Sequence, residues 1–184
     1  MPKIVRKTPG EFTIDWEKYK HLFKELTVPA KTVLLQEGEV SKKAYFIVKG
    51  CLRLWFNNKG NDITFQFFFE NEGVSSIESF NTGEPSLFSI ESVEPSIVYE
   101  LNKANYKKIF FDNPEYNAII HDVILKRLSH YSRLFMGYIK NSPEERYKEL
   151  LKNSPHIVQR IPQHYIASYL GITPVSLSRI RNRV

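Results

Sequence analysis

The residues best suited to a chemical role lie near the C-terminus, where short hydroxyl side chains are interleaved with arginines. They are Ser176, Ser178, Arg179, Arg181 and Arg183. An arginine can form two hydrogen bonds with the O6 and N7 atoms of guanine, and a hydroxyl can bond a base or a phosphate. From Pro155 to Val184 the chain has four arginines and no Asp or Glu. Because phosphate contacts supply much of the affinity for nucleic acid, this segment favours a polyanionic partner such as DNA.

Two short helices joined by a glycine turn would position these side chains. The apolar positions at helical spacing are Ile166, Ala167 and Leu170 in the first helix and Leu177 and Ile180 in the second. Gly171 stands where the first helix needs a left-handed residue. Thr173 supplies an N-cap hydroxyl, and Pro174 occupies the first helical position. The pattern predicts a helix-turn-helix, although a helical hairpin with a solvated basic face would share it.

Composition sets the broad class of the protein. With 184 residues, 42% hydrophobic and 25% charged, the chain is expected to fold into one medium or two small domains. The formal net charge of +6 is compatible with a nucleic-acid partner. Cys51 is the single cysteine, which excludes an intramolecular disulfide and a cysteine-based metal cluster. No apolar run is long enough for a signal peptide or a membrane span, so we expect a cytoplasmic protein with no membrane partner.

Between residues 28 and 101 the apolar pattern is that of strands. The segment Phe12 to Leu26, before it, has helical spacing and predicts an amphipathic helix. After Val28, β-branched and aromatic runs alternate with glycines every ten to thirteen residues. Lys59-Gly60 is the expected tip of one hairpin. This pattern predicts a double-stranded antiparallel β-roll of the jelly-roll kind, and the chain as a whole is expected to be α+β.

Helical periodicity returns after Leu101. A short helix is expected from Asn102 to Phe111, and a long one from about Glu115 to Lys140. An apolar seam on the long helix steps by four or three residues through Ile120, Ile124, Leu128, Tyr131, Phe135 and Tyr138. This near-heptad spacing favours pairing with a second copy as a homodimer, although the seam could instead face the core of one chain. Ser142-Pro143 begins the next helix.

Three domains follow from these signals. They are a β-roll with flanking helices at 1–114, a dimerisation helix at 115–140, and a helix-turn-helix domain at 141–184. The chain ends almost at the end of the last helix, so no β-wing is evident after it.

In its order of parts the chain resembles the Crp–Fnr family of bacterial transcription regulators. The segment LLQEGEVSKKAYFIVKGCLRLWF at 34–56 is similar to the family's strand, Gly-Glu, Tyr-Phe-Ile and Gly pattern. NPEY at 113–116, SPEERYKELL at 142–151 and the helix-turn-helix complete a resemblance that runs from about Leu22 to Val184. The short form ending in PVSLSRIRNRV is most similar to regulators of the Bacteroidetes type.

The resemblance implies a dimeric regulator that binds double-stranded DNA at a two-fold symmetric operator, with RNA polymerase as a further partner. Arg179 matches a family arginine that reads a base edge, and Ser176 lies one turn earlier on the same face. Val175 would touch a thymine methyl or only pack. The residues expected to contact DNA are Gln163, Thr173, Val175, Ser176, Ser178, Arg179, Arg181 and Arg183. Residues 174–175 replace a charged pair of the family, so the family's operator sequence does not transfer.

The same resemblance implies an effector in the roll, but the residues that would bind cyclic AMP are changed. Ser75-Ser76 replace the Gly-Glu pair, and Ser86-Leu87 replace the arginine and hydroxyl pair. From Glu70 to Asn102 there are seven glutamates and no Lys or Arg, so a cyclic phosphate would lose a charge-assisted pairing of about 1.5–3 kcal/mol. We therefore predict no cyclic-nucleotide binding, and either an uncharged or cationic effector or none. Tyr131 and Ser132 fall where the family's long helix reaches its nucleotide.

Other classes find little support in the sequence. The histidines are His21, His121, His130, His156 and His164, and all lie outside the strand region. A metal-binding cupin would need them on the strands, and no catalytic triad or phosphate loop stands out, so we expect no enzyme, no metal and no cofactor. The remaining alternative is a β-roll sensor or scaffold whose C-terminal helices bind a protein rather than DNA.

Overall fold

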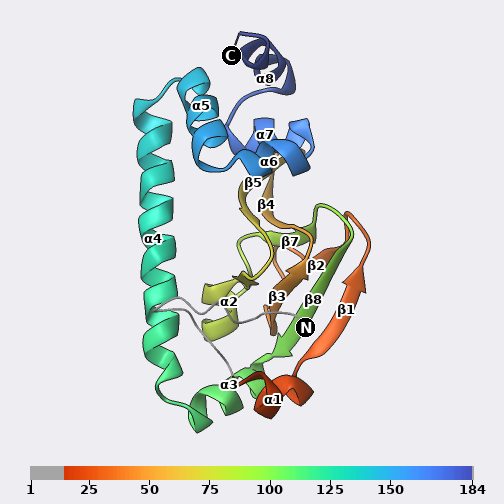
Figure 1. The fold of residues 1–184 in the computed structure, drawn as a ribbon. Helices are drawn as coiled ribbons and strands as arrows, with labels where there is room; N and C mark the ends of the chain where they lie inside the picture. Colours follow the sequence, from red (N-terminus) through yellow and green to blue (C-terminus); the bar gives the residue numbers. More distant parts are fainter. Residues whose placement is uncertain (1–14, 184) are drawn as a thin grey trace. The chain divides into compact units, whose positions relative to one another are not determined.

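The computed structural model describes residues 15–183, and its N-terminal half is built from two four-stranded antiparallel sheets (Figure 1). The first sheet has the order β1-β8-β3-β6 and the second the order β2-β7-β4-β5. The strands are β1 (Lys24–Val28), β2 (Val33–Leu35), β3 (Lys43–Lys49), β4 (Leu52–Asn58), β5 (Asn61–Phe68), β6 (Gly73–Val74), β7 (Ser89–Ser92) and β8 (Ser96–Asn102). The α+β class and the antiparallel roll predicted from the sequence are confirmed.

The alternation of apolar side chains explains how the second sheet is buried. Leu52 and Leu54 on β4 and Ile90 on β7 point to one face and are almost fully buried. Lys59 and Gly60 both have positive φ, at 54° and 88°, and form the two-residue turn between β4 and β5. This is the conformation that a type I′ hairpin needs, and the predicted hairpin tip is confirmed.

The predicted helix from Phe12 to Leu26 is wrong after Leu22; residues 12–14 lie outside the described residues. Only α1 (Trp16–Tyr19) and the 3-10 helix η1 (Lys20–Leu22) are helical, and β1 begins at Lys24. Leu26 pairs with Val98 of β8 instead of continuing the helix. The local spacing of the aromatic residues fits a helix, but the ladder to a strand distant in sequence determines the structure of this segment.

Helices α1 and α3 (Lys103–Asp112) lie at one end of the first sheet (Figure 1). A cluster of buried side chains joins them, consisting of Tyr19, Leu101, Ile109 and Tyr116. The amide of Asn113 closes the cluster by donating hydrogen bonds to the Tyr19 hydroxyl at 2.6 Å and the Ile109 carbonyl at 2.7 Å. The predicted end of this helix before Asn113-Pro114 therefore has a polar side chain as its cap.

The remaining helices are α2 (Ile77–Thr82), α4 (Tyr116–Lys140), α5 (Pro143–Asn153), α6 (Pro155–Arg160), α7 (Gln163–Tyr169) and α8 (Pro174–Arg181). Helices α2 and α6 were not predicted. Ser142 and Glu145 form the reciprocal capping box at the start of α5, with distances of 3.3 and 2.7 Å. Within the described residues the chain forms two compact units, 15–56 with 67–123 and 57–66 with 124–183, so α4 contributes to both.

Across residues 15–183, no helix has the length and apolar character needed to cross a membrane.

Candidate DNA-binding site and effector pocket

Helices α7 and α8 lie on either side of Gly171, with the cap and the buried stripes that the C-terminal sequence predicts. Leu177 and Ile180 form the buried stripe of α8, and Ile166 and Ala167 that of α7. The Thr173 hydroxyl accepts a hydrogen bond from the Ser176 amide at 3.1 Å and so caps α8. Because the apolar stripe faces inward, the polar side of α8 is left on the surface.

Most of the residues expected to contact DNA lie on this polar side of α8 or next to its ends, whereas Gln163 is the first residue of α7. All of them are exposed except Ser176, which is half-buried. The Ser176 hydroxyl lies 3.0 Å from that of Thr173, so both hydroxyls already take part in the helix cap. Val175 is 60% exposed, which excludes the alternative that it only packs against the core. An exposed apolar side chain beside Arg179 can reach the methyl group of a thymine.

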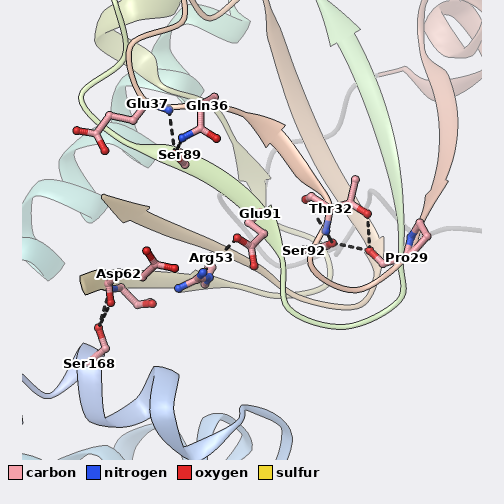
Figure 2. Close-up of polar contacts among 11 residues, drawn as sticks. Pro29, Thr32, Gln36, Glu37, Arg53, Asp62, Ser89, Glu91, Ser92 and Ser168 are labelled. Atoms are coloured by element: carbon pink, nitrogen blue, oxygen red, sulfur yellow. Dashed lines mark hydrogen bonds and ion pairs between the residues drawn. The ribbon is translucent and has the colours of Figure 1, made fainter. Parts of the chain in front are cut away.

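Ser168 joins strand β5 to α7. Its hydroxyl accepts a hydrogen bond from the Thr64 amide at 2.8 Å and donates one to the Asp62 carbonyl at 3.0 Å (Figure 2). This contact could not be predicted from the sequence, because a serine in an amphipathic helix carries no signal of so distant a partner. One hydroxyl thus anchors residues 57–66 to α7, the first helix of the predicted helix-turn-helix.

Two of the predicted effector residues meet inside the roll. Ser76 and Ser86 are buried, and their hydroxyl oxygens lie 2.9 Å apart. The Ser86 hydroxyl also lies 2.7 Å from the Phe88 carbonyl. Leu87, in contrast, is 72% exposed and contributes nothing to this buried polar pair, and Ser75 is half-buried. The positions that correspond to the nucleotide anchors are therefore occupied by neutral hydroxyls that satisfy one another.

A buried ion pair in the roll was missed from the sequence. The Arg53 guanidinium on β4 lies 3.1 Å from the Glu91 carboxylate on β7, and the two side chains are 2% and 8% exposed (Figure 2). The Arg53 guanidinium also stacks 4.9 Å from the centroid of the Trp55 ring. The absence of Lys and Arg from residues 70–102 therefore did not mean that the roll has no cation. In the sequence, the sign of this ion pair is Arg53 itself, a charged residue inside the apolar run of β4.

Much of the predicted apolar seam of α4 is exposed in the single chain. Ile124, Leu128 and Phe135 are 39%, 60% and 64% exposed, while Ile120 and Tyr131 are half-buried. The Ser132 hydroxyl bonds the Leu128 carbonyl of its own helix at 2.9 Å.

The last seam residue, Tyr138, takes part in a different contact. Its hydroxyl donates a hydrogen bond to the Tyr169 carbonyl at the end of α7. Burial raises the pKa of both tyrosine hydroxyls above the ordinary value, so Tyr138 remains a hydrogen-bond donor at neutral pH.

Among residues 15–183, no group of three or more His, Cys, Asp or Glu side chains is arranged to hold a metal ion.

The roll matches a known protein family. Residues 25–113 match the family model of the cyclic nucleotide-binding domain. No curated protein sequence matches the chain.

Solved structures extend the likeness to almost the whole chain. The c-di-GMP-responsive global regulator CLP of Xanthomonas campestris is 15% identical with a TM-score of 0.75, and the match covers 91% of this chain and 88% of that one. FixK2 of Bradyrhizobium japonicum is 15% identical with a TM-score of 0.76, covering 88% and 83%. The Thermus thermophilus catabolite activator protein is 16% identical with a TM-score of 0.59, covering 100% and 86%. The resemblance inferred from the sequence is confirmed at the level of the fold: residues 25–113 match the model of the cyclic nucleotide-binding domain, and the chain has the fold of solved Crp–Fnr-type regulators.

Proposed function

We propose that this protein is a dimeric, non-enzymatic transcription regulator that reads a two-fold symmetric DNA site with α8 and does not bind cyclic AMP. The observation that supports it best is the exposed face of α8. Leu177 and Ile180 bury its inner stripe, whereas Arg179 and Arg181 stand in solvent. From 155 to 183 the only charged residues, apart from histidine, are arginines, so nothing in this segment repels phosphate.

Selection of bound DNA from a random pool tests the proposal directly. A dimer should select a palindromic site with half-sites about one helical turn apart. In gel-shift titrations on that site, Arg179→Ala should lose about 1–3 kcal/mol of binding free energy and relax the preference at one base pair. Arg181→Ala should weaken all sequences alike and reduce the salt slope by about one.

The control for lost charge is Lys152→Ala, which removes an exposed cation from α5, on another helix of the same unit. It should bind the selected site within about two-fold of wild type, since a distant surface charge is screened at physiological salt. Wild-type affinity in both arginine variants would refute the placement of the reading helix. Failure of the wild type to select any DNA would favour the alternative in which these helices bind a protein.

The exposed seam of α4 supports dimerisation. Contiguous exposed apolar surface of this kind marks an interaction site, and here the side chains follow a near-heptad spacing. Sedimentation should show a dimer for the wild type and a monomer for Leu128→Glu and Phe135→Glu. Ser129→Glu places the same charge on an exposed position next to Leu128 and should remain dimeric. Identical sedimentation of all four proteins would contradict the assignment of the seam.

The buried hydroxyl pair supports the prediction that cyclic AMP is not the effector. A cyclic phosphate at Ser76 and Ser86 would displace their mutual hydrogen bond without gaining a cation at either position. CLP is c-di-GMP-responsive, and the same charge argument applies to a cyclic dinucleotide. Calorimetry with cyclic AMP, cyclic GMP and c-di-GMP should show no binding at micromolar concentration. Micromolar binding of any of the three would overturn the prediction.

A further inference from the structure

The end of α4, the start of α5 and the turn between α7 and α8 meet at one arginine. Arg146, half-buried on α5, donates a hydrogen bond from Nη1 to the Asn141 carbonyl at 2.8 Å. Its Nε and Nη2 donate to the Leu170 carbonyl at 3.2 and 3.0 Å. The planar fork of the guanidinium thus connects the residue that follows α4 with the residue that follows α7.

Tyr138 makes a second bond between the same two helices. It lies in the last turn of α4, and its hydroxyl donates to the carbonyl of Tyr169, next to Leu170. Its ring also lies beneath Arg146, with the guanidinium carbon 5.1 Å from the ring centroid. Carbonyls in the last turn of a helix have no donor within the helix, so these two side chains supply donors to α7 from outside.

Gly171 brings the turn into direct contact with this pair. It has a φ of +66°, and a Cβ built on it would lie 3.3 Å from Cε1 of Tyr138. A side chain at this position would therefore be in tighter contact with the ring than ordinary packing allows. Helix α8 begins three residues later at Pro174, with Thr173 as its cap, so little chain is left between this joint and the reading helix.

We propose that Tyr138 and Arg146 are positioning residues that hold α8 at a fixed angle to α4 and thereby set the half-site spacing that a dimer accepts. The inference rests on the proposed function, because spacing has meaning only for two paired copies. Neither residue lies on α8, the proposed reading helix. Each base pair inserted between half-sites rotates the second by about 34–36°, so a rigid joint makes binding depend strongly on spacing.

The test uses the full chain and the DNA site selected by the wild type, together with versions lengthened by one and by two base pairs and a single half-site. Tyr138→Phe keeps the ring and removes the hydroxyl, and Arg146→Lys keeps the charge and removes the fork. Each variant should lose about ten-fold in affinity at the native spacing and bind the three spacings more equally. Binding to the single half-site should stay within about two-fold of wild type, which a general loss of folding would not allow.

A measurement without DNA separates this inference from the proposed function. Spin labels on cysteines introduced at Arg133 and Asn182, in a Cys51→Ser background diluted with unlabelled chain, report the distance between α4 and the end of α8. The distance distribution should be narrow in the wild type and broad in Tyr138→Phe and Arg146→Lys. Lys152→Gln, a charge change on α5 outside the joint, should leave it narrow.

The outcomes are distinct. Unchanged distance distributions in both joint variants, or an unchanged spacing preference, would overturn the inference even if the wild type binds its operator. A wild type that selects no DNA would refute the proposed function and, with it, the role in spacing.

Discussion

Replacing Gly171 by alanine measures how tightly the turn of the helix-turn-helix packs on α4. Two terms act at this position. A left-handed backbone costs an L-residue about 1–2 kcal/mol, partly offset by about 0.4–1 kcal/mol because alanine restricts the unfolded chain. The new Cβ would also stand 3.3 Å from the Tyr138 ring, and overpacking of this kind costs about 1–3 kcal/mol. We expect the free energy of unfolding to fall by about 2–3 kcal/mol.

Gly60→Ala is the matched control. Gly60 has a φ of +88° and nothing within 4 Å of its Cβ position, and it belongs to the same compact unit. It should show the conformational cost alone, about 1 kcal/mol. In a Tyr138→Leu background the ring is absent, and the loss for Gly171→Ala should fall to that of Gly60→Ala.

The assay is denaturant unfolding followed by circular dichroism at 222 nm, because the unit that contains Gly171 is largely helical. Trp16 and Trp55 both lie in the other unit, so tryptophan fluorescence reports that unit separately. Equal losses for Gly171→Ala and Gly60→Ala in the wild-type background would refute the contact with Tyr138.

Two further predictions concern buried charge. Glu91→Gln removes the carboxylate paired with Arg53 and should lower the free energy of unfolding of the roll by about 3 kcal/mol, whereas replacing both residues by leucine should change it little. Trp55 fluorescence during urea unfolding measures both variants. A Glu91→Gln variant as stable as the wild type would contradict the pairing. Burial, and secondarily Arg133, lowers the pKa of His130 below 6.5. The unfolded chain therefore binds a proton at this imidazole more readily than the folded chain does. The stability that the neutral His130 contributes is complete above pH 6.5 and is lost as the pH falls through the lowered pKa. His130→Gln should reduce the loss of stability between pH 7 and pH 5. An unchanged loss would show that His130 is not a source of this pH dependence.

Local signals determine which elements could be predicted. Thr173, Pro174 and the stripe of Leu177 and Ile180 specify α8 within a single short segment, and the structure has this helix. The capping box at Ser142 is equally local. In these cases the residues that stabilise the element are the residues of the element itself, so a single sequence contains the whole argument.

Contacts distant in the chain could not be predicted. Leu26 has helical spacing to its neighbours but lies in a strand, because β8 supplies its hydrogen-bonding partner. The sequence shows Arg53 as a charged residue within an apolar run, but its pairing with Glu91 depends on the register between β4 and β7. The hydrogen bond of the Ser168 hydroxyl likewise depends on the packing of β5 against α7. Such contacts require the topology, which apolar periodicity alone does not provide.

Tyr138 connects the proposed dimer seam with the proposed reading helix. Its spacing places it in the seam with Phe135, and 42% of its surface remains exposed for a partner. Its hydroxyl meanwhile bonds the end of α7. If α4 pairs along the proposed seam, packing of the partner against this ring favours the rotamer that the Tyr169 carbonyl requires. The two effects are linked: the free energy by which this rotamer favours dimerisation equals the free energy by which dimerisation favours the bond that orients α8. Tyr138→Phe should therefore weaken the dimer slightly as well as loosen the spacing preference, whereas Phe135→Leu should affect the dimer alone.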